Sequence, residues 1–124
     1  MAIQILRAVT QHVNYLKMVR RCLEQGPEHS LCCDHHSCLF GKWYDSDGSA
    51  MIEAMKLPEA TRLWGEIGQH HEIFHDDSIA AVQARGADMA HASRLETAMM
   101  QRFTLLVNRL LALDEIVNQK AMVA

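Results

Sequence analysis

Residues 3–23 of the chain read IQILRAVTQHVNYLKMVRRCL, and this stretch decides the class of fold. Its apolar residues recur every three or four positions, which is the spacing of one face of an α-helix. They are Ile5, Val9, Val13, Leu16, Val19 and Leu23. Gly26 and Pro27 follow and predict the end of the helix. The chain is therefore expected to begin with a long amphipathic helix that buries one face.

The next part of the chain changes from loop to short helices. Residues 26–37 have no hydrophobic period and are expected to form a loop. A short helix is predicted over 38–44, closed by the turn signal DSDG at 45–48. Ser49 is expected to cap a further short helix, in which Ile52 and Met55 face inward.

Two long helices are predicted for the rest of the chain. Pro58 suits the first turn of the first one, which runs to about Arg85, where Gly86 interrupts it. The last helix is predicted over 88–117, and no run alternates between apolar and polar residues as a strand does. The expected fold is all-α, a single domain over 1–124 built as an antiparallel four-helix bundle, with Cys38 on its short helix.

Composition excludes several classes of function. The net charge is -3 and no basic stripe suggests nucleic-acid binding. No long uncharged apolar run predicts membrane insertion, and the N-terminus lacks the basic region and apolar block of a signal peptide. A cytoplasmic location is the expectation.

The cysteines and histidines are unusual in number and position. The chain has 4 cysteines and 8 histidines. Cys32, Cys33 and Cys38 fall in one short stretch together with His35 and His36. Disulfides are rare in a reducing cytosol, so metal binding is the better interpretation of this composition. Cys22, near the end of the first helix, is expected to be structural.

Four residues are candidates for metal ligands on local grounds. His71 and His75 are one helical turn apart and so share a face, whereas His70 points about 100° away. His12 lies mid-helix among apolar neighbours, and Cys38 opens a helix whose dipole favours the thiolate. Each signal also has an ordinary explanation. His71 and His75 could be a chance surface pair, His12 a buried histidine satisfied by a hydrogen bond, and Cys38 a small buried thiol.

The order of these residues resembles a known family. His12-x-x-Tyr15 is followed after 22 residues by CLFGKW at 38–43, and after a further 27 residues by His71-x-x-x-His75. This pattern resembles the bacterial chemoreceptor zinc-binding (CZB) domain family. The resemblance implies that His12, Cys38, His71 and His75 bind one Zn²⁺ per chain. It also implies that Tyr15, Phe40, Gly41 and Trp43 support the site.

The donor set suits zinc better than its competitors. Three imidazoles and one thiolate favour tetrahedral zinc. A haemerythrin-like di-iron protein is the less favoured alternative, because no histidine here has a glutamate four residues later. An enzyme is not expected, because four protein ligands close the coordination shell. A structural or zinc-buffering protein stays open.

The resemblance further implies a sensory module. Members of that family regulate chemoreceptors and diguanylate cyclases, respond to zinc and in some cases to hypochlorous acid, and commonly form homodimers. Cys38 would then be the redox-sensitive group. Cys32, Cys33, His35 and His36 are unusual beside that family, and three interpretations stay open for them: a disulfide of Cys32 or Cys33 with oxidised Cys38, metal binding, or no specific role. The chain carries no output motif, so it is expected to be either a free-standing family member, which would signal through a partner protein, or an excised domain.

Overall fold

The computed structural model describes residues 3–25 and 38–123, all of which except a few connecting residues are helical. The elements are α1 (Ile3–Gln25), α2 (Leu39–Trp43), the π-helical turn η1 (Tyr44–Gly48), α3 (Ser49–Met55), α4 (Pro58–Arg85) and α5 (Met89–Val123). These described residues contain no strand, and no helix among them has the length and apolarity needed to cross a membrane.

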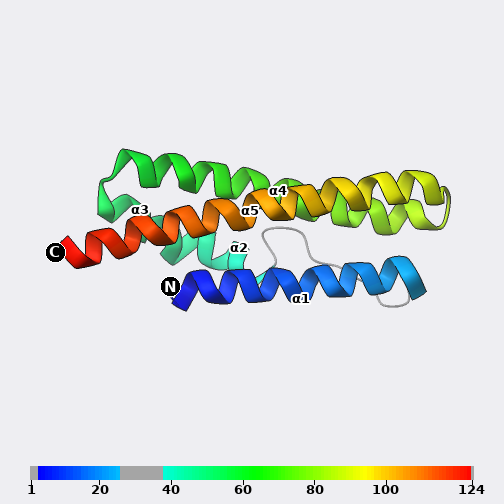
Figure 1. Cartoon of the computed structure of the whole chain (residues 1–124), viewed down its shortest axis with the longest axis horizontal. Coiled ribbons are helices and arrows are strands. Elements are labelled where there is room, and N and C mark those ends of the chain that lie inside the picture. The colour runs from blue at the N-terminus through cyan, green and yellow to red at the C-terminus, as the bar shows by residue number, and fades with distance from the viewer. Residues whose placement is uncertain (1–2, 26–37, 124) are drawn as a thin grey trace.

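The helices alternate in direction along the chain. Figure 1 shows α1 and α4 running one way, and the α2–α3 segment and α5 running the other. The most extensive contact joins α4 to α5, while α1 contacts α2, α4 and α5. The prediction of an all-α antiparallel four-helix bundle is confirmed, with α2, η1 and α3 together forming its short fourth member.

The predicted turn at 45–48 is wrong. Gly48 has right-handed helical angles (φ -64°, ψ -47°), and the chain passes from α2 through η1 into α3 without leaving helical geometry. The glycine is needed for packing instead, because a Cβ there would lie 2.8 Å from Cη2 of Trp64. Ser49 does not cap α3 either; its hydroxyl donates to the Tyr44 carbonyl at 2.5 Å.

The ends of the long helices follow the sequence signals, with one exception. Asp88 caps α5, since its Oδ1 accepts from the His91 backbone N–H at 3.1 Å. Arg85 at the end of α4 donates to the carbonyls of Leu23 and Glu24 and so closes the last turn of α1. Helix α5 was predicted to end near 117 but continues to Val123.

The core lies between the three long helices and the short segment. Its largest fully buried apolar side chains include Ile5, Val19, Ile67, Phe74, Met99, Leu106, Leu110 and Leu113. Three histidines share this interior: His12 and His71 are 2% exposed and His75 is 0% exposed. Burying a polar ring stabilises a fold only if its nitrogens find partners, so these histidines mark a polar site within an apolar core.

Candidate metal centre

Four side chains from three segments converge in the core. His12 lies on α1, Cys38 precedes α2, and His71 and His75 lie on α4. One donor atom from each residue lies within 4.8 Å of the donor atoms of the other three. Cys38 Sγ lies 3.2 Å from His71 Nε2. The structure therefore brings together all four residues that the family resemblance selected.

The ring of His12 is oriented by its own helix. Its Nδ1 lies 2.6 Å from the Ala8 carbonyl oxygen, which can only accept, so the proton is on Nδ1. Nε2 is therefore the nitrogen with the lone pair. Burial lowers the pKa of His12, with the Ala8 hydrogen bond opposing the shift. A neutral imidazole of defined tautomer is the form that binds a metal.

Cys38 occupies the N-cap position of α2. Its Sγ accepts from the Gly41 backbone N–H at 3.2 Å, so the thiol takes the role that a serine oxygen has in other caps. Cys38 has an extended backbone (φ -75°, ψ 158°). This conformation starts the helix and directs the sulfur back over its first turn, where the partial positive charge favours a thiolate.

The aromatic residues of the motif line the same place. Phe40 is 3% exposed and meets the rings of His12 and His71 edge-on, with centroids 5.3 Å and 4.9 Å away. The centroid of the Trp43 ring lies 5.9 Å from that of Phe40 and 5.4 Å from that of Trp64. Gly41 is buried, and its N–H reaches the thiol. Phe40 thus packs against two of the candidate ligands.

A buried serine, not identified from the sequence, ties α1 to α4 beside the cluster. The Ser78 hydroxyl donates to the His75 carbonyl at 2.7 Å. It has only one proton, so the Tyr15 hydroxyl is the donor in the 2.7 Å contact between the two side chains. The Tyr15 ring also lies 4.6 Å from His75. The one sequence signal was that Ser78 lies three residues after His75, on the same helix face.

His70 faces a different helix, as expected. Its Nδ1 accepts from the Arg102 guanidinium on α5 at 2.9 Å. Burial, followed by the charges of Arg102 and Arg109, lowers the pKa of His70, against an opposing effect of Glu66. The neutral ring is thereby a hydrogen-bond acceptor for α5.

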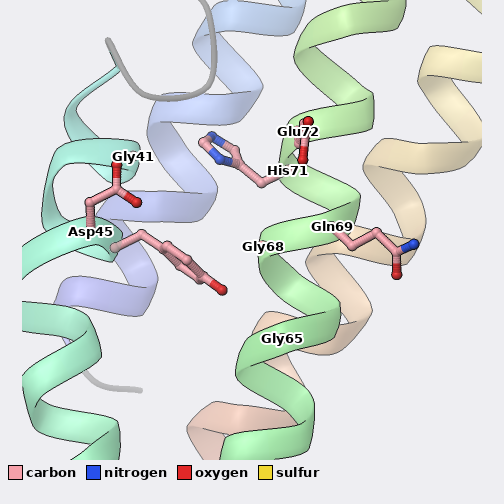
Figure 2. A pocket seen from close by; sticks show the side chains of 8 residues that line it. Gly41, Asp45, Gly65, Gly68, Gln69, His71 and Glu72 are labelled. Atoms are coloured by element: carbon pink, nitrogen blue, oxygen red, sulfur yellow. The ribbon is translucent and has the colours of Figure 1, made fainter.

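An open pocket of about 310 Å³ borders the cluster between the Cys38-bearing segment and α4. Tyr44 and Asp45 line one side, and Gly68, His71 and Glu72 line the other. Figure 2 shows His71 pointing from α4 across the end of this pocket. The pocket therefore opens beside one of the candidate ligands.

Two other cysteine predictions have different outcomes. Cys22 is fully buried on α1, as expected of a structural residue. Cys32, Cys33, His35 and His36 lie outside the described residues, so their suggested redox or metal roles stay predictions.

Comparison with known families identifies the chain at this point. Residues 12–82, more than half of its length, match the family model of the chemoreceptor zinc-binding domain. The chain belongs to the CZB family. Comparisons with the curated proteins and with the solved structures give no match. The matched CZB region begins at His12 and includes Cys38, His71 and His75, so the family model spans the whole cluster.

The CZB cluster has the chemistry of a zinc site. Donor atoms around tetrahedral zinc are about 3.3–3.6 Å apart. Cys38 Sγ and His71 Nε2 are already 3.2 Å apart. All four donor atoms lie within 4.8 Å of one another, so zinc binding needs a contraction of at most about 1.5 Å. Nitrogen and thiolate donors in this number suit Zn²⁺ and not a carboxylate-bridged di-iron centre. The residues therefore fit zinc.

Proposed function

We propose that this CZB domain binds one zinc ion per chain through His12, Cys38, His71 and His75, and that it reports zinc availability and oxidants to a signalling protein. The convergence of the four donors carries this proposal. Bound zinc would hold α1, the start of α2 and α4 together, because each contributes at least one donor. A change in occupancy would then change how these segments dock.

Cys38 gives the proposed sensor its second input. A thiolate is oxidised by hypochlorous acid to a sulfenic acid with release of chloride, and a sulfenic acid is a poorer zinc ligand than a thiolate. Cys38 is only partly buried, whereas the three histidines are buried. The sulfur is therefore the donor that an oxidant reaches most easily.

The proposal also includes the setting of the domain. We expect it to be cytoplasmic, to form homodimers and to act on a chemoreceptor or diguanylate cyclase partner, as the family does. It is expected to have no catalytic activity, because four protein donors leave zinc no open position for water.

Metal content before and after one equivalent of hypochlorous acid tests the function. We expect one zinc per chain, released on oxidation from a protein that keeps its helical circular dichroism. Cys38→Ser is expected to bind zinc more weakly and to release none in response to the oxidant. Zinc that stays bound after Cys38 is oxidised would leave a structural or zinc-buffering role. Iron, or no metal, would remove the ligand assignment.

A further inference from the structure

A closed ring of three hydrogen bonds joins the segment that carries Cys38 to α4. The Tyr44 hydroxyl donates to the Trp64 carbonyl at 2.7 Å, and Trp64 Nε1 donates to Ser49 Oγ at 3.1 Å. The Ser49 hydroxyl donates in turn to the Tyr44 carbonyl at 2.5 Å. We call Tyr44, Ser49 and Trp64 the Tyr44 latch. None of the three belongs to the candidate ligand set.

The latch is also a stacked pair of rings. The Tyr44 and Trp64 rings lie 4.3 Å apart and 10° from parallel. Burial, with the nearby Asp45 carboxylate, raises the pKa of the Tyr44 hydroxyl, so it keeps its proton and remains a donor. Each ring thus contributes apolar contact together with a hydrogen bond from its polar edge.

Two glycines leave the space that the latch occupies. A Cβ added to Gly68 would clash with the Tyr44 hydroxyl and lie 2.7 Å from Cζ. A Cβ on Gly48 would lie 2.8 Å from the Trp64 ring. Gly65, one turn before Gly68, has nothing within 4 Å of such a Cβ. Figure 2 shows Gly65 and Gly68 in sequence along the stretch of α4 that leads to His71.

The latch fixes the direction of α2. The Ser49–Tyr44 bond spans the π-helical turn, so it holds the register between α2 and α3. The hydrogen bond and the ring stacking between Tyr44 and Trp64 hold the α2–α3 segment in place against α4. Cys38 lies six residues before Tyr44, less than two helical turns away. We propose that the Tyr44 latch is a positioning element that keeps Cys38 Sγ facing His71 before zinc binds.

This inference rests on the proposed zinc site and predicts how its affinity is set. A thiolate that is already in place avoids the loss of chain entropy that binding would otherwise cost. Residues that orient metal ligands typically change affinity by about 10–100-fold when altered. We expect Tyr44→Phe, which keeps the stacking and loses the hydroxyl, to weaken zinc binding about 10-fold. Gly68→Ala, which displaces the phenol, is expected to do the same or more.

The experiment measures zinc affinity by competition with a chelator, with Gly65→Ala as the matched control. Gly65→Ala makes the same change in the same helix, with the same gain in helix propensity, and is expected to leave zinc affinity within about 2-fold. Cobalt substitution gives a separate readout. The thiolate-to-cobalt absorption band should weaken in Tyr44→Phe and Gly68→Ala and stay unchanged in Gly65→Ala.

A second background separates positioning from general stability. If the latch acts through Cys38, Tyr44→Phe should cost no further zinc affinity once Cys38→Ser is present, since coupled residues are not additive. An equal loss in both backgrounds would overturn the inference, as would a wild-type affinity in both latch variants. Should Gly68→Ala fail to fold, Tyr44→Phe alone decides. A wild-type protein that binds no zinc would instead refute the proposed function, and this inference with it.

Discussion

Helix α4 has two interfaces that differ in chemistry. Its contact with α5 is the most extensive between the described elements. This contact includes apolar side chains such as Phe74, whose ring centroid lies 5.7 Å from that of Phe103. An ion pair also joins the two helices, with Arg109 Nε 3.2 Å from Glu66 Oε2. Against α1 and α2 the same helix presents buried His71 and His75.

The difference teaches which part of the molecule a metal can control. Apolar burial stabilises the α4–α5 pair whether or not an ion is present. A buried polar cluster stabilises the docking of α1 and α2 fully only when its donors are satisfied. Zinc is therefore expected to act on how α1 and α2 pack against a pair of helices that it leaves unchanged.

The largest effect is expected from a cavity in the apolar core on the α5 side. Leu110 is fully buried on α5, so Leu110→Ala should lower the free energy of unfolding by about 2–5 kcal/mol. Its zinc affinity in the folded state should stay close to wild type. Urea denaturation with and without zinc, combined with a zinc titration, measures both. A large loss of zinc affinity would mean that the two interfaces are not separable.

Removing a metal-binding donor from the polar interface should have the opposite result, with zinc affinity as the quantity that changes most. His75→Ala is expected to weaken zinc binding by more than about 100-fold, since even residues that merely orient ligands account for about 10–100-fold. Calorimetric titration measures this loss. His91→Ala, at an exposed position on α5, is the control and should bind as wild type. Equal affinities in the two variants would take His75 out of the site.

A smaller effect is expected at the hydrogen bond between α1 and α4. Tyr15→Phe removes the donor to Ser78 and should lower the free energy of unfolding by about 1 kcal/mol. Zinc affinity should fall a few-fold, because Ser78 still holds the His75 carbonyl. In a double-mutant cycle with Ser78→Ala, the two losses should not add. Full additivity would argue that the hydroxyls act separately.

The smallest effect is expected at His70, which can be compared directly with its neighbour His71 on α4. His70 is adjacent to His71 yet accepts from Arg102 on α5. We expect His70→Ala to change zinc affinity by less than about 2-fold, as typical of substitutions away from a site. His71→Ala, measured beside it, should behave like His75→Ala. A similar loss in both neighbours would place His70 at the metal.

The bundle and the cluster were predictable for different reasons. The three- and four-residue period of α1 follows from burying one helix face, so it is visible locally. The pair His71 and His75 is visible in the same way, whereas their meeting with His12 and Cys38 could be inferred only from the family's pattern.

What could not be predicted depends on residues far away in the chain. Asp45 to Gly48 has the composition of a turn, but the segment is π-helical and packs against Trp64, whose ring lies 2.8 Å from where a Cβ at Gly48 would be. Ser78 looks like an ordinary helix serine until Tyr15, 63 residues away, packs beside it. Local propensity carries no information about such partners.

The π-helical turn makes the number of residues between Cys38 and α4 part of the site. A π-helical turn holds one residue more than an α-helical one. A deletion of one residue within Tyr44–Gly48 that restored α-helical geometry would therefore leave the direction of α2 relative to α3 nearly unchanged. The same deletion within Leu39–Trp43, which is α-helical, would rotate Cys38 by about 100° around the helix axis and take the thiol off the side that faces His71. Two related chains with identical donors and a one-residue gap are therefore equivalent or not according to where the gap falls, and an alignment that misplaces it would hide the difference.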